Sequence, residues 1–215
     1  MIHFSSSRLF CVGLFLCFEL GQALGQLPTA HMTAVFPLGC QIGEETEVQV
    51  HGGDLEGAAE LRFSHPGITA ELTNADERKF KVRVAVDVPS GVYEVRFAGA
   101  LGLSNSRLFA VGTLNESRSP SGNTSIKNAA ALGADSVVNG VSVTRQSSWF
   151  QVGAKKGQRL LLRVSAKALD SRMSPVMLLR SGAGERLARA NADGLIDHTA
   201  PADGNYFVQI HDAVF

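Results

Sequence analysis

Apolar and polar residues alternate with a period of two through much of the chain. In residues 80–86, Phe80, Val82, Val84 and Val86 are separated by polar or small residues, so one face of this segment is apolar. Strands that rest one face on a core and expose the other to solvent have this period. Before residue 112 the same pattern is found in segments 46–51, 59–63 and 93–97.

Alternation returns in the last third of the chain, at residues 159–167 and 206–211. Clusters of glycine, proline and aspartate separate the alternating segments, and no long stretch has the spacing of an amphipathic helix. Short strands at regular intervals are typical of β-sandwiches. The sequence therefore predicts an all-β protein that consists of two small β-sandwiches.

Residues 113–125 (TLNESRSPSGNTS) interrupt this pattern. The segment is rich in serine and has no large apolar residue after Leu114. Serine-rich segments of this kind behave as flexible chains. We therefore expect a first sandwich over 26–112, a flexible linker over 113–125 and a second sandwich over 126–215.

The N-terminus resembles a secretory signal peptide. Arg8 lies in a short polar start, residues 9–20 form an apolar stretch, and small residues precede Gly25. Cleavage is expected between Gly25 and Gln26, so residues 1–25 would be removed. A buried N-terminal helix is the alternative. The apolar stretch is shorter than the roughly 20 residues that a membrane span needs. No later segment is long and apolar enough either, so we expect an exported protein in the periplasm, at the cell surface or outside the cell.

The composition excludes some partners and limits the covalent chemistry. Lys and Arg total 20 and Asp and Glu total 20, so the formal net charge is zero, which argues against a nucleic-acid partner. Removal of the signal would leave Cys40 as the single cysteine, and one thiol forms no intramolecular disulfide. We expect a structural role for Cys40.

Catalytic motifs for serine hydrolases, zinc peptidases and nucleotide-binding enzymes are missing from the sequence. The histidines are scattered, and His65 lies in a turn where a surface position is expected. We therefore predict no catalytic residues and no cofactor. Asn191, Asp193 and Asp197 are the metal candidates, because their oxygens surround a glycine as in a calcium loop. The alternative reading of this segment is an Asx-type turn between strands.

The first predicted sandwich resembles the immunoglobulin-like IPT/TIG domains of surface and secreted proteins. The resemblance is carried by Phe36–Gly39, the TEVQVHG strand at 46–52, the turn at Val88–Tyr93 and the closing stretch Gly102–Asn105. It implies an immunoglobulin-like fold without catalytic chemistry.

The second predicted sandwich is similar to the jelly-roll-like pre-peptidase C-terminal (PPC) domains of bacterial exported proteins. Trp149-Phe150, residues 153–160 and the segment Thr199–Tyr206 carry this resemblance. It implies a bacterial source and a further strand after the position of Phe215, so the domain is expected to lack its last strand. The acidic residues that often precede the aromatic pair in the family are replaced here by Gln146, Ser147 and Ser148.

These patterns predict a non-catalytic exported protein whose β-sandwich modules serve adhesion, spacing or binding. The expected partner is a protein or a polysaccharide surface. The alternative is an accessory fragment of a secreted peptidase whose catalytic part is absent, in which case that peptidase is the partner.

Overall fold

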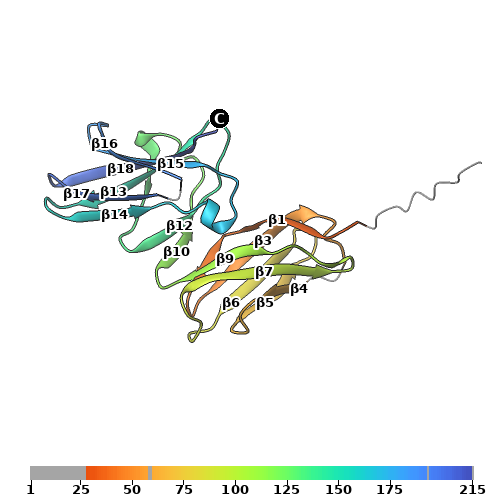
Figure 1. Cartoon of the computed structure of the whole chain (residues 1–215). Helices are drawn as coiled ribbons and strands as arrows, with labels where there is room; N and C mark the ends of the chain where they lie inside the picture. The colour runs from red at the N-terminus through yellow and green to blue at the C-terminus, as the bar shows by residue number, and fades with distance from the viewer. Residues whose placement is uncertain (1–27, 58–59, 193, 215) are drawn as a thin grey trace, which may run out of the picture.

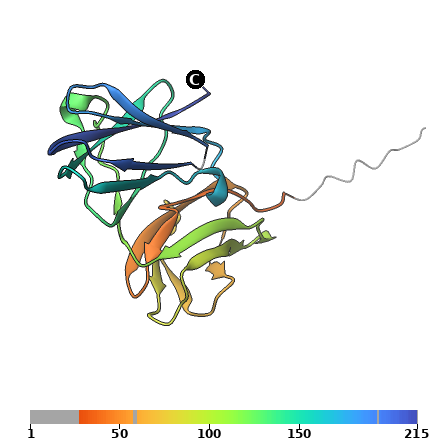
Figure 2. The same ribbon diagram turned by 60° about the vertical axis from the view of Figure 1, so that its left-hand side comes forward.

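The structure is a computed structural model that describes residues 28–57, 60–192 and 194–214. The predicted signal segment 1–25 and its cleavage site at Gly25 and Gln26 lie outside the described residues. The described chain is all-β and forms two sandwiches, which confirms the predicted fold class. We call residues 28–112 the N-terminal module and residues 113–214 the C-terminal module. They lie side by side in Figures 1 and 2.

The N-terminal module is a sandwich of two mostly antiparallel sheets. One sheet has the strand order β1-β3-β6-β5, and the other has the order β2-β9-β7-β4 with β8 paired to β7. The strands of the first sheet are β1 (His31–Phe36), β3 (Glu45–Gly53), β5 (Ile68–Asn74) and β6 (Lys79–Val84). Those of the second are β2 (Gly39–Gln41), β4 (Glu60–Phe63), β7 (Gly91–Gly99), β8 (Gly102–Leu103) and β9 (Arg107–Gly112).

Three phenylalanines hold these two sheets together. Phe80 on β6, Phe97 on β7 and Phe109 on β9 are fully buried. Phe80 and Phe97 come from opposite sheets and meet edge to face, with ring centroids 6.5 Å apart. Burial of aromatic area between facing sheets is the main stabilising contribution of such a core.

Val86 does not take the core position that the alternation predicted for it. Strand β6 ends at Val84, and Val86 is 82% exposed. The chain turns instead of continuing, since Ala85 N–H donates to Gly67 O and Val88 N–H donates to Ala85 O. Val88 fills the core in place of Val86 and is 1% exposed.

The C-terminal module contains a five-stranded sheet of order β11-β13-β18-β15-β16 and a two-stranded sheet of β14 and β17. The strands of the larger sheet are β11 (Ala130–Ala131), β13 (Ser147–Ala154), β15 (Pro175–Arg180), β16 (Arg186–Asn191) and β18 (Gly204–Asp212). The smaller sheet is formed by β14 (Arg159–Arg163) and β17 (Leu195–Thr199). Short 3₁₀ turns occur at η1 (Ile126–Asn128) and η2 (Lys167–Leu169).

The core of this module lies between sheets of unequal size. Phe150, Met177, Tyr206 and Val208 point inward from the larger sheet and pack against Leu160 and other side chains of the smaller one. Strand β18 occupies the middle of the larger sheet, whereas β14 and β17 pair with each other and with no further strand in the described part of the chain. The prediction that a closing strand is missing stays a prediction.

The segment expected to be a flexible linker is in part regular structure. Residues Asn115–Arg118 form β10, which pairs in parallel with β12 (Ser136–Asn139). Farther along, Asn123 is buried and its side-chain amide donates to Trp149 O at 3.1 Å. Serine-rich composition predicted flexibility, but backbone pairing with a distant segment orders these residues.

Candidate functional site

The junction between the two modules contains a concave site. Strand β10, which pairs with β12, lies beside β2 of the N-terminal module, and η2 lies beside β9. Figures 1 and 2 show both β10 and η2 on the side of the C-terminal module that faces its neighbour. The junction is therefore built from elements of both modules.

Asn139, the last residue of β12, connects three elements through its side chain. Its Oδ1 accepts a hydrogen bond from Leu38 N–H of the N-terminal module at 3.2 Å. Its Nδ2 donates to Glu116 Oε2 on β10 at 2.8 Å. The Asn139 side chain therefore uses both its oxygen and its nitrogen to hold β10 and β12 against the chain just before β2.

Two arginines make further contacts across the junction. Arg118 donates to Glu47 O on β3, and its guanidinium lies over the Phe36 ring, 5.6 Å from the centroid. Arg107 on β9 donates both to Thr33 O and to Asp170 O beyond η2, the latter at 3.0 Å. Arginine is suited to such positions because its planar group supplies several donors in a fixed geometry.

A polar pocket of about 330 Å³ lies at this junction. Its walls combine β2 and the start of β3 with β10 and the end of β12. The residues that line it are Pro37, Gly39, Cys40, Gln41, Glu44, Glu45, Thr46, Asn115, Glu116, Ser117, Arg118 and Asn139. Catalytic and ligand-binding sites commonly lie in pockets whose walls contain titratable groups.

The Cys40 thiol is held in its unreactive, protonated form. Cys40 is 2% exposed, and desolvation, followed by the nearby Glu116 and Glu44 carboxylates, raises its pKa to about 11. The thiolate is the nucleophilic form of cysteine, and catalytic cysteines have a lowered pKa. The shift at Cys40 therefore has the opposite sign from the one that catalysis needs.

Glu116 is a structural carboxylate of the junction. Burial raises its pKa above the ordinary value, and the hydrogen bond from Asn139 opposes that rise. A β-carbon placed on Gly39 would come within 3.1 Å of Glu116 Oε1 and 2.6 Å of Ala110 O. Only glycine leaves room at position 39 for both the β2–β9 pairing and the Glu116 carboxylate.

The histidines considered as catalytic candidates are dispersed in the structure. The ring of His65 accepts from Gly67 N–H at 3.1 Å and lies against Tyr93, which fixes the turn before β5. His198 points toward Tyr206 inside the C-terminal module. Burial lowers the pKa of His211 on β18. The structure brings none of these three to Cys40 in the junction pocket.

The calcium candidates lie at β16 and β17. Asn191 Oδ1 accepts a hydrogen bond from Arg189 Nε at 2.8 Å. Arg159 donates to both carboxylate oxygens of Asp197 and lowers the pKa of that group. Asp193 lies outside the described residues. Arginine thus occupies oxygens of two of the three candidates, and calcium binding here stays a prediction.

Asn139, Arg107 and Arg118 are junction residues that the sequence patterns did not single out. None lies in a motif, and each acts through a backbone carbonyl or amide that is distant in sequence. The Asn139-Gly140 pair indicates a turn at this point, but it does not indicate what the amide side chain contacts.

The comparisons with known proteins bear on the N-terminal module. Residues 29–106 match the family model for domain III of the quinohemoprotein amine dehydrogenase alpha subunit, a β-rich domain. This match covers less than half of the chain. Among curated protein sequences, none matches the chain. The resemblance to IPT/TIG and PPC domains stays an expectation.

Solved structures give only distant likenesses. One is the Bacteroides ovatus mixed-linkage glucan utilization locus protein SGBP-B in complex with a mixed-linkage heptasaccharide. It is 12% identical, the match covers 87% of this chain and 74% of that one, and the TM-score is 0.31. Another is DIP-gamma IG1+IG2, with 8% identity, 80% and 83% coverage and a TM-score of 0.27. The Yersinia pseudotuberculosis adhesin InvE has 9% identity, 85% and 51% coverage and a TM-score of 0.26. TM-scores this low support no conclusion about ligand or function.

Proposed function

We propose that this chain is a non-catalytic, exported binding protein in which an ordered junction fixes two β-sandwich modules. The observation that carries the proposal is the state of the junction pocket. Its thiol is buried with a raised pKa, and its half-buried carboxylate is bound by Asn139. Both groups serve the contact between the modules rather than a reaction.

Three further properties support the proposal. The formal net charge is zero, so binding to a highly charged polymer through bulk charge is not favoured. The described residues contain no group of three or more His, Cys, Asp or Glu side chains arranged to hold a metal ion. Among the described residues there is also no helix with the length and apolarity to cross a membrane. Rigid β-scaffolds of this kind commonly carry their function on exposed loops and sheet faces.

The proposal predicts that the purified protein does not turn over general peptide, ester or glycoside substrates. The assay compares the unaltered protein with Cys40→Ser, His65→Ala, His198→Ala and His211→Ala, all checked by circular dichroism. All five proteins should give the background rate. Turnover by the unaltered protein that disappears in one folded variant would contradict the proposal.

A further inference from the structure

The larger sheet of the C-terminal module has a second face that does not contact the core. Phe150, Val208 and Met177 point into the core, so their neighbours along β13, β18 and β15 point outward. The strand register arranges these outward residues in rows across four strands. The rows are Ser147–His211–Val176–Asn191, Trp149–Gln209–Leu178–Arg189 and Gln151–Phe207–Arg180–Arg186. We call these twelve residues the outer face.

The outer face has an unusual composition, and its exposed residues are Arg186, Arg189 and Asn191, at the edge strand β16. It contains two aromatic side chains and three arginines, and none of its twelve residues, all within the described chain, is Asp or Glu. The exposed surface of β3 and β6 is different, since Glu45 there pairs with both Lys81 and Arg83. The three arginines therefore give these twelve side chains a net positive charge, and Asp212, next to His211 on β18, is a carboxylate close to this face.

Arg180, in the row Gln151–Phe207–Arg180–Arg186 at one end of the outer face, is held in a defined position. Its Nε donates to Gln209 Oε1 and its Nη1 donates to Gly184 O, both at 3.0 Å. Its guanidinium lies 5.7 Å from the centroid of the Trp149 ring. Gln209 is fixed in turn, because its Nε2 donates to Ser147 Oγ at 3.0 Å. These contacts use Nε and Nη1 of Arg180 and fix the orientation of its guanidinium group before any ligand binds.

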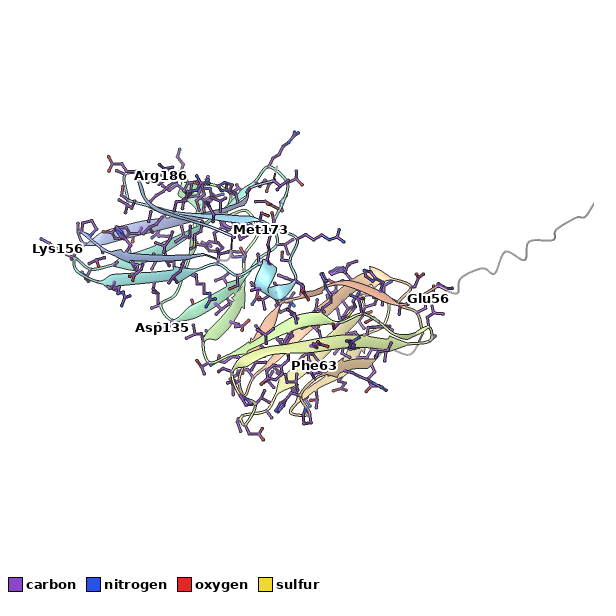
Figure 3. The ribbon with its side chains drawn as sticks, in the orientation of Figure 1. Glu56, Phe63, Asp135, Lys156, Met173 and Arg186 are labelled. Carbon is purple, nitrogen blue, oxygen red and sulfur yellow. The ribbon has the colours of Figure 1, made fainter. Side chains whose placement is uncertain are left out.

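Two more cations flank this position. Arg189 is exposed. Desolvation, followed by the charge of Arg189, lowers the pKa of His211, and the Asp212 carboxylate opposes this shift. Arg186 is also exposed, and Figure 3 shows it on the side of β16 that faces away from the N-terminal module. A ligand along the rows would therefore meet several positive groups together with the half-buried rings of Trp149 and Phe207.

We propose that the outer face binds an acidic polysaccharide whose sugars carry carboxylates, that is, a polymer of uronic acids. This inference rests on the proposed function and names its ligand class. Arginine pairs with carboxylates through two parallel hydrogen bonds, and aromatic rings present flat apolar surfaces to the C–H faces of sugar rings. Gln151 and Gln209 supply donors and acceptors that fit sugar hydroxyl groups.

A purely structural role explains only part of this arrangement. Val176 and Leu178, which the register places on the outer face, are 4% and 8% exposed, so this face contains an apolar floor that is covered. Lysine and glutamate stems would cover such a floor equally well. The absence of Asp and Glu among these twelve described residues and the fixed Arg180 group are what a structural covering does not require.

The test is electrophoresis of the folded protein through gels that contain polygalacturonate, with a gel containing a neutral β-glucan as the reference. The variants are Arg180→Gln and Arg189→Gln. Arg189 is exposed, so its variant carries little risk of misfolding. The matched control is Arg163→Gln, an exposed arginine on β14 of the smaller sheet. Each of the three variants loses one positive charge relative to the unaltered protein. Thermal melting checks that all four proteins fold.

Polygalacturonate should slow the unaltered protein and the Arg163→Gln control equally, whereas Arg180→Gln should weaken binding by about tenfold or more. Arg189→Gln should weaken it by a smaller factor. No retardation of the unaltered protein, or equal losses in Arg180→Gln and Arg163→Gln, would overturn the inference. Released reducing ends are measured in the same samples. Hydrolysis of the polymer would contradict the non-catalytic function, whereas lack of binding would contradict only the ligand class.

Discussion

Replacing Asn139 by alanine is expected to lower the free energy of unfolding by about 2–3 kcal/mol. The change removes the hydrogen bond to Glu116 Oε2 and leaves Leu38 N–H without its acceptor. Hydrogen bonds to a charged group contribute about 1.5–3 kcal/mol, more than those between neutral groups. The measurement is urea unfolding at pH 7, followed by circular dichroism.

The control for this variant is Asn115→Ala in the adjacent strand. Asn115 is exposed, and its side chain makes no hydrogen bond to another described residue. Its replacement should change the free energy of unfolding by less than about 0.5 kcal/mol. If the two variants unfold at the same urea concentration, Asn139 does not hold the junction.

The pH dependence of the Asn139→Ala effect identifies Glu116 as its partner. Because the pKa of Glu116 is raised in the folded state, its stabilising contribution is present at low pH and is lost as the pH rises through the folded pKa. Asn139 offsets that loss by binding the carboxylate. Asn139→Ala should therefore lower the free energy of unfolding more at pH 7 than at about pH 4, where the Glu116 carboxyl group binds its proton. At pH 7, Asn139→Ala should also cost less in a Glu116→Gln background.

Replacing Phe97 by alanine is expected to lower the free energy of unfolding of the N-terminal module by about 3–5 kcal/mol. Phe97 is fully buried between the two sheets of the N-terminal module and contacts Phe80 of the opposite sheet. Truncation of the ring loses its burial and leaves a cavity that neighbouring rings fill only in part. The control is Val92→Ala on the same strand, where the side chain is 53% exposed.

Two optical probes separate the modules in this experiment. Trp149 is the single tryptophan of the chain and lies in the C-terminal module, so its fluorescence reports that module alone. Circular dichroism reports both modules. In Phe97→Ala the part of the dichroism change that comes from the N-terminal module should move to a much lower urea concentration than the Trp149 transition. Equal shifts of the two signals would show that the N-terminal core is not an independent unit.

The sequence was most informative where one side of a strand is buried. Alternation in 46–51, 80–84 and 206–211 predicted strands β3, β6 and β18 and the faces that they bury. The prediction was wrong at Val86, because the turn at 85–88 is set by hydrogen bonds to Gly67 and Ala85 and not by the hydrophobic period. Periodicity does not indicate where a strand ends.

The sequence patterns did not predict the junction. Strand β10 consists of Asn115–Arg118, which are all polar, and its ladder partner β12 begins eighteen residues after β10 ends. Its order comes from tertiary contacts such as those of Asn139 and Arg118, which leave no periodic signal. The sequence predicted only part of the outer face. Alternation separated Phe207, Gln209 and His211 from the core, but only the strand register shows that Arg180 lies beside Trp149.

Backbone ¹⁵N relaxation shows whether the junction holds the two modules together as one rigid body. The measurement gives a rotational correlation time for each module separately. Contacts made by Asn139, Arg107 and Arg118 predict a single correlation time for both modules, appropriate to the whole chain. Two shorter and unequal correlation times, as for independent sandwiches on a flexible linker, would show that the junction does not hold the modules together.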